Sequence, residues 1–91
     1  MKLNKLTSLE SDSYEIIDPF IVDIEKSGNV WVATIDELML CSEGASRQEA
    51  FLRLREEVIE LCDDLISEDD DVLGIYPLVW KKILNKKVRQ C

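Results

Sequence analysis

The fold is decided by the stretch from residue 20 to residue 35, which reads FIVDIEKSGNVWVATI. In its first half, apolar side chains alternate with polar ones, as they do in a strand with one buried face. The alternating apolar set there is Phe20, Val22 and Ile24, and Ile21 is the exception to the pattern. Gly28 and Asn29 tolerate the positive φ angles of a tight turn. The residues after the turn are mostly β-branched or aromatic, which favours a second strand. The stretch therefore predicts a β-hairpin.

Residues 46–65 predict a long amphipathic helix. Ser46 and Glu49 have the spacing of a capping box, in which the serine hydroxyl accepts a hydrogen bond from the Glu49 amide. Apolar residues then recur at steps of three and four: Ala50, Phe51, Leu54, Val58, Leu61, Cys62 and Leu65. Their stripe predicts about five helical turns packed against a sheet.

A short connection joins the hairpin to this helix. Residues 38–41 are apolar enough for a third short strand, and residues 42–44 predict a turn. The order of elements makes the fold α+β. We expect a small antiparallel β-sheet in β-β-β-α-β order, with one long helix packed on one face and a short C-terminal element.

The whole chain, residues 1–91, is expected to be a single domain, because either half alone would be too small to bury a stable core. Residues 1–15 are mostly polar and predict a loose leader. Three leucines in it have the spacing of a frayed amphipathic turn: Leu3, Leu6 and Leu9. Residues 17–66 form the expected core, and residues 67–91 combine an acidic loop with a basic C-terminal segment.

The segment after the long helix allows two interpretations. Residues 67–71 are one serine and four acids, which predict a loop because acids oppose the dipole at a helix C-terminus. Residues 72–76 favour a short fourth strand, whereas Pro77 stands where a helix can begin. Residues 72–88 are therefore compatible with either a strand or a helix.

Charge is divided unevenly along the chain. Residues 1–80 carry 6 basic and 19 acidic side chains, a net charge of −13, whereas residues 81–91 carry 5 basic side chains and no acid. The total of −8 should repel nucleic acid from the chain as a whole. No apolar run is long enough for a membrane span and no signal-peptide core is visible, so we expect a cytoplasmic protein without membrane contact.

The residue types present exclude most catalytic and cofactor-binding motifs. The chain has no histidine, 3 cysteines without a CxxC pair, and 3 scattered glycines. No His-based triad, zinc site, Walker motif or dinucleotide motif can be built from these residues. We therefore expect no catalytic residue, no metal and no cofactor, and a protein that is not an enzyme.

A carboxylate-metal nuclease is the remaining enzymatic alternative, because two-metal sites are built from converging carboxylates. The acids near strand ends are Asp23, Glu25, Asp36 and Glu37. Asp23 and Glu25 alternate with the apolar residues of their strand, so we expect them on the solvated face of the sheet.

The segment order and several residues resemble the HicB-like family, which has a degenerate RNase H-type fold. Val30 to Thr34 take the place of the family's second strand, and Asp36 to Cys41 take the place of its acidic, leucine-containing turn. Gly44, Ser46 and Glu49-Ala50 correspond to the glycine, the cap and the Glu-Ala pair that opens the helix. The resemblance covers residues 17–66, and the family's Pro-Gly is replaced by Met39-Leu40.

This resemblance implies a protein that binds other proteins. HicB-like chains are usually antitoxins that cover HicA, a small basic RNA-cleaving toxin. We expect this chain to act in that way as a homo-oligomer. Many HicB-like chains also carry a C-terminal DNA-binding module. The roughly 25 residues after the long helix are fewer than such modules use, so we do not expect direct DNA binding. The alternative is a solitary self-associating regulatory or structural module with no toxin partner.

Four residues are the predicted partner-binding set: Trp31, Asp36, Glu37 and Met39. The acids would attract a basic toxin and speed its association. Trp31 has two interpretations. It either faces away from the helix, in an apolar second face with Ile21, Ala33 and Ile35, or it belongs to the core.

The basic C-terminal segment also has alternatives. Trp80 and the lysines could contact nucleic acid, or the segment could pair with the acidic surface of a second subunit. We favour a terminal helix that docks through three apolar residues: Trp80, Ile83 and Leu84.

Overall fold

The computed structural model describes residues 2–66, 71 and 74–90. It contains the strands β1 (Lys2–Leu6), β2 (Tyr14–Ile16), β3 (Phe20–Ser27), β4 (Val30–Ile35), β5 (Leu40–Gly44) and β6 (Val88–Gln90). The helices are a 3-10 turn, η1 (Asp36–Leu38), the long α1 (Arg47–Leu65) and the shorter α2 (Ile75–Lys87). The expected α+β fold is confirmed, with one long helix and a short C-terminal helix and strand.

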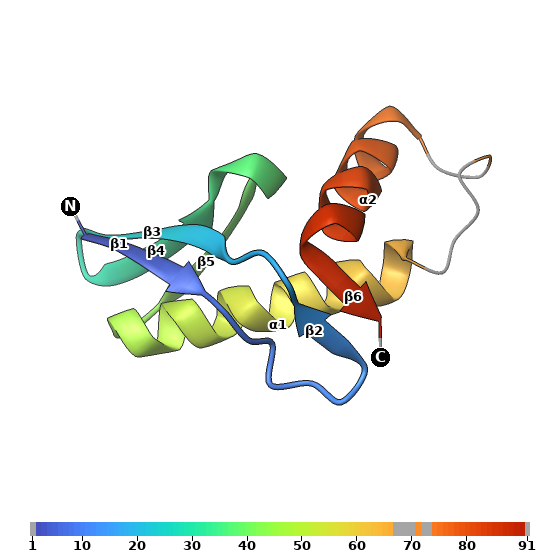
Figure 1. Cartoon of the computed structure of the whole chain (residues 1–91). Helices are drawn as coiled ribbons and strands as arrows, with labels where there is room; N and C mark the ends of the chain where they lie inside the picture. Colours follow the sequence, from blue (N-terminus) through green and yellow to red (C-terminus); the bar gives the residue numbers. More distant parts are fainter. Residues whose placement is uncertain (1, 67–70, 72–73, 91) are drawn as a thin grey trace.

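Four strands form an antiparallel sheet in the order β1-β3-β4-β5, and β2 pairs with β6 in a separate two-stranded ribbon. Helix α1 runs along one face of the four-stranded sheet. Helix α2 lies beside the C-terminal half of α1 (Figure 1). The predicted hairpin is β3 and β4, whose turn places Gly28 at a φ of 61°.

The core lies between the sheet and α1. Phe20, Val22 and Ile24 of β3 are buried, as their alternation predicts. The apolar stripe of α1 is buried through Ala50, Leu54, Val58, Cys62 and Leu65. The Ser46 hydroxyl accepts a hydrogen bond from the Glu49 amide at 3.1 Å, which confirms the predicted helix cap.

The register of β4 corrects the prediction of an apolar second face. Ala33 lies opposite Ile24 in the sheet, and cross-strand partners share a face. Ala33 and Ile35 are therefore fully buried toward α1, and Trp31 packs half-buried against the same core. Ile21, which is 55% exposed, lies on the opposite face.

The N-terminal residues are not a loose leader. β1 pairs with β3 along its whole length, and Leu6 and Leu9 are both 1% exposed. β2 also falls in this segment and pairs with β6. Both pairings satisfy backbone groups through partners distant in sequence, which local polarity does not reveal.

Three boundaries also differ from the prediction. Leu38 belongs to η1, because Met39 turns the chain at a φ of 52° before β5 starts. The predicted turn at residues 42–44 is part of β5. A fourth strand is predicted at residues 72–76, but α2 starts at Ile75. Residues 72–73, and residues 67–70 of the predicted loop, lie outside the described residues.

The C-terminal alternatives are settled in favour of helix for most of the segment. α2 docks through Leu84, which is fully buried, with Trp80 and Ile83 packed against the core. The chain then turns into the short strand β6.

Gly44 is where the sheet meets the start of α1. A Cβ atom at this position would lie 2.5 Å from the Ala50 backbone nitrogen, far inside van der Waals contact. The absence of a side chain thus allows the last residue of β5 to lie directly against the first turn of the helix.

We predict that Gly44→Ala lowers the free energy of unfolding by about 3 kcal/mol, because the helix must move away from the sheet. Gly28→Ala is the matched control, because its added Cβ would meet no atom within 4 Å and only the positive φ is unfavourable. We expect this variant to lower the free energy of unfolding by about 1 kcal/mol. Urea unfolding of both variants measures the difference, and equal losses would contradict a close contact at Gly44.

Candidate functional site

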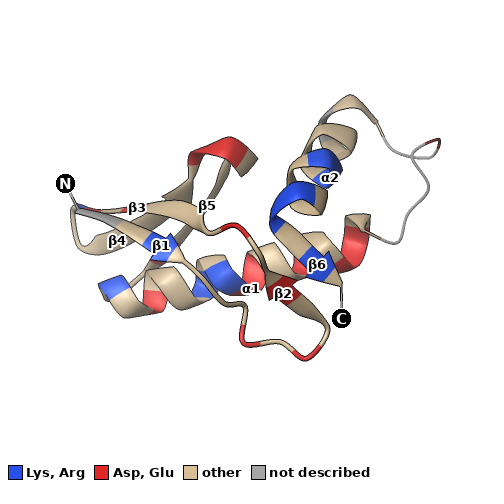
Figure 2. Cartoon of the chain, viewed as in Figure 1, with Lys and Arg blue, Asp and Glu red and all other residues tan. Residues whose placement is uncertain are grey.

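Three of the four predicted partner-binding residues lie together at the bend between β4 and β5. Asp36 and Glu37 are exposed on η1, and Met39 is 66% exposed directly after it. Leu38 is fully buried and anchors the bend. The bend therefore presents two carboxylates and one flexible apolar side chain to solvent. In Figure 2 the ribbon of this acidic segment, which follows β4 and precedes β5, is drawn in red.

Trp31 does not join this group, because it lies at the other end of β4, where it pairs with Gly44. Its ring is half-buried and is covered by the Arg47 guanidinium, with the Arg47 Cζ atom 5.4 Å from the ring centroid. This cation–π contact between the sheet and the first residue of α1 gives Trp31 a role in packing.

Lys87, at the end of α2, is a residue that the sequence did not single out. Its Nζ lies 2.9 Å from Glu37 Oε1 and 3.8 Å from Asp18 Oδ2, and it donates to the Pro19 carbonyl at 3.2 Å. The same ammonium lies 5.1 Å from the centroid of the Phe20 ring. With 17% of its side chain exposed, Lys87 ties α2 to both η1 and the start of β3.

The basic C-terminal segment thus forms hydrogen bonds and ion pairs with other parts of the same chain. The Lys87 carbonyl accepts hydrogen bonds from the amides of Ile17 at 2.8 Å and Asp18 at 3.2 Å. Arg89 pairs with Glu15 across the β2–β6 ribbon. These contacts give at least two of the five basic residues intramolecular partners.

We predict that Lys87→Ala lowers the free energy of unfolding by about 1–3 kcal/mol, since charged hydrogen bonds and a half-buried cation are lost together. Lys86→Ala is the control, because this neighbour on the same helix is exposed and should change the value by less than about 0.5 kcal/mol. Urea unfolding would contradict the role of Lys87 if the two variants were equally stable.

A second long-range contact joins β2 to α1. The Tyr14 hydroxyl donates to Asp63 Oδ1 at 2.6 Å, and the Tyr14 ring is buried. The hydrogen bond to Asp63, helped by burial, raises the pKa of Tyr14 from 10.0 to about 12. Ionisation of the phenol would remove the donor and place two negative charges side by side.

We expect Tyr14→Phe to lower the free energy of unfolding by about 1 kcal/mol at pH 8. Because the folded-state pKa is raised, this stabilisation is complete below the ordinary value of 10 and declines as the pH rises toward 12. Urea unfolding from pH 8 to 12 should show the wild type losing its advantage over the variant. A difference that stays constant with pH would contradict this assignment.

A groove runs between the edge strand β5 and α1, with a volume of about 450 Å³. We call it the β5–α1 groove; it is lined by Cys41, Ser42, Glu43, Arg53, Glu56, Glu57 and Glu60. Four of these seven residues are glutamates. Sequence reasoning missed this groove, although the three glutamates of α1 follow a helical spacing that places them on one flank.

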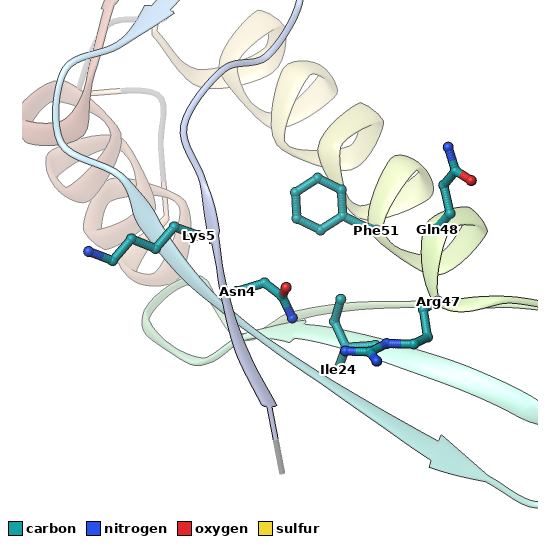
Figure 3. A pocket seen from close by; sticks show the side chains of 6 residues that line it. All are labelled: Asn4, Lys5, Ile24, Arg47, Gln48 and Phe51. Atoms are coloured by element: carbon teal, nitrogen blue, oxygen red, sulfur yellow. The ribbon is translucent and has the colours of Figure 1, made fainter.

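A smaller pocket of about 300 Å³ lies at the opposite edge, between β1 and the first turn of α1. Asn4, Ile24, Arg47 and Phe51 gather around it, while the Lys5 ammonium extends away from them (Figure 3). The Asn4 Nδ2 atom is buried and makes no hydrogen bond within the described structure. The pocket offers amide and guanidinium donors.

The acids named for a nuclease are separated. Asp23 and Glu25 share the open face of the sheet, opposite Thr34 and Val32, whereas Asp36 and Glu37 lie on η1. Within residues 2–66, 71 and 74–90, no three histidine, cysteine or acidic side chains converge in a way that could hold a metal ion.

The two described cysteines differ in environment. Cys62 is buried in the core, and burial raises the pKa of its thiol to about 12, so it packs as a small apolar side chain. Cys41 is exposed on β5. Among the helices of the described residues, none has the length and apolar character of a membrane span.

In comparisons with known proteins, the chain matches no family model, no curated protein and no solved structure.

Proposed function

We propose that the chain is a non-enzymatic binding protein of the HicB type, which covers a small basic RNA-cleaving protein in the cytoplasm and acts as a homo-oligomer. The observation that carries this proposal is the acidic bend at η1, where Asp36 and Glu37 stand exposed beside Met39. A basic nuclease must present positive charge to RNA, so an acidic surface is complementary to its substrate-binding face.

The segment order supports the same proposal. The resemblance to HicB-like chains implies a hairpin, an acidic turn and a capped helix in succession, and the chain folds with these elements in this order. Met39 adds an adaptable apolar side chain, of the kind that is common at protein-binding surfaces. Direct DNA binding is not part of the proposal.

Affinity purification of the tagged chain from its native lysate, with mass spectrometry and light scattering, tests the proposal. One small basic protein in fixed stoichiometry is the expected result. Recovery of the chain alone as a discrete oligomer would contradict the proposal and favour the solitary self-associating module.

We predict that Asp36→Lys weakens binding of that partner by about tenfold or more, because the charge changes by two at the interface. Asp12→Lys makes the same change in net charge at another exposed site and is the control. Asp36 makes a cleaner test than Glu37, whose ion pair with Lys87 contributes to the fold. Titration calorimetry at two salt concentrations measures both variants, and equal affinities would remove η1 from the interface.

A further inference from the structure

The outer edge of β5 carries backbone groups that point away from the sheet. β5 is the last strand in the sheet order, so one of its sides has no strand partner among residues 2–66, 71 and 74–90. Ser27 and Val30 flank the two-residue turn. Residues in this position of a two-residue hairpin form a hydrogen-bonded pair, and this sets the alternation of backbone directions across β4. It follows that Ser42 directs its backbone groups toward β4, whereas Cys41 and Glu43 direct theirs outward.

The position of Arg53 agrees with this alternation. Its Nη1 donates to the Glu43 carbonyl at 3.2 Å, and its Nη2 lies 3.0 Å from Glu49 Oε1. One outward acceptor of β5 is thus occupied. By the same alternation, the N–H and C=O of Cys41 and the N–H of Glu43 are also directed outward, and both residues line the β5–α1 groove.

The α1 side of this groove is a line of like charges. Glu56, Glu57 and Glu60 lie three, four and seven residues after Arg53, so they share one flank of the helix. Glu56 and Glu60 are four residues apart, a spacing at which like charges destabilise a helix. Within the described part of the chain, these three glutamates make no ion pair.

The floor of the groove contains a polar group without a partner. Ser42 is 7% exposed, and its hydroxyl oxygen is buried and makes no hydrogen bond within the described residues. A buried hydroxyl without a partner is unfavourable. Ser42 lines the same groove as the glutamates. A rotation of its side chain would bring the enclosed oxygen to a donor bound there.

From these features we infer that the β5 edge binds an extended basic segment of a partner protein, which adds a strand to the sheet. Its backbone would pair with Cys41 and Glu43, while arginine or lysine side chains face Glu56 and Glu60. The inference deepens the proposed function and rests on it, because it gives the basic partner a docking edge on this chain.

The chemistry of the groove favours this occupant over a second copy of the chain. Two β5 edges paired with each other would bring Glu43 and the α1 glutamates of both copies together, and like charges across strands are destabilising. A basic segment instead supplies opposite charges along an extended backbone. Arginine fits best, since its planar fork can bond a carboxylate while it also donates to the Ser42 hydroxyl.

The probe is a six-residue peptide that alternates arginine and valine, with blocked ends, titrated into the full chain. We expect saturable binding, with shifts of the Cys41 and Glu43 amide resonances and hydrogen exchange at these two amides slowed by about tenfold. The first control replaces arginine with glutamate. The second keeps the arginines but carries N-methyl groups on every backbone nitrogen, which removes the donors from both edges of the peptide and prevents strand pairing.

Variants of the chain locate the site. Glu56→Gln, Glu57→Gln and Glu60→Gln together should weaken peptide binding by about tenfold or more, whereas a triple variant of exposed acids elsewhere should weaken it by less than about threefold. That matched control is Glu10→Gln, Asp12→Asn and Glu25→Gln, which reaches the same net charge. Ser42→Ala should weaken peptide binding severalfold without lowering the urea unfolding midpoint.

Several results would overturn the inference. They are no binding of the arginine peptide, equal binding of the N-methylated peptide, an equal loss of peptide affinity in the two triple variants, or amide resonance shifts confined to the open face of the sheet.

The proposed function can fail separately from the edge site. If a basic partner co-purifies equally well with the Glu56, Glu57 and Glu60 triple variant, the inference fails and the function stands. If no partner is recovered but the peptide binds as expected, the edge site stands and the function fails.

Discussion

Gly44 lies so close to the first turn of α1 that a single added carbon would meet the Ala50 nitrogen at 2.5 Å. This contact fixes where the helix starts and makes it run back along the strand it has just left. One face of the sheet is thereby buried against α1, and in the described part of the chain the outer sides of β1 and β5 have no strand partner. The acidic flank of α1 falls beside β5 because of the same geometry, so packing at one glycine determines the charge of the groove.

Lys87, the last residue of α2, imposes the second constraint. It neutralises Glu37 and Asp18 and covers the Phe20 ring, so part of the basic segment stabilises the chain itself. Asp36 of η1 and the α1 glutamates of the β5–α1 groove remain exposed. The negative charge of the described surface is therefore concentrated at these places, and the proposed function depends on it.

The parts of the fold that follow from local patterns could be predicted from the sequence. The β3–β4 hairpin, the Ser46 cap and the α1 stripe each depend on residues within a few positions of one another. β1 and the β2–β6 ribbon could not, because their strands pair with distant segments. Asp36, Glu37 and Met39 are neighbours in the sequence, so their common position at one bend could be predicted. The sequence leaves the orientation of Trp31 open, because it depends on the register of β4. The roles of Lys87 and Ser42 could not be predicted, because their neighbours in the fold are distant from them in the sequence.

The β2–β6 ribbon also sets an order of events during synthesis. Its Arg89–Glu15 pair joins residues 74 positions apart, so β2 stays unpaired until every other element has been made. The hairpin, β5 and α1 are complete well before that point, and contacts between such near neighbours form quickly. The β5 edge is therefore assembled while β2 and β6 are still apart. A nascent chain would expose its strand edge to other unfinished chains, and the glutamates beside it would keep such chains from pairing with one another.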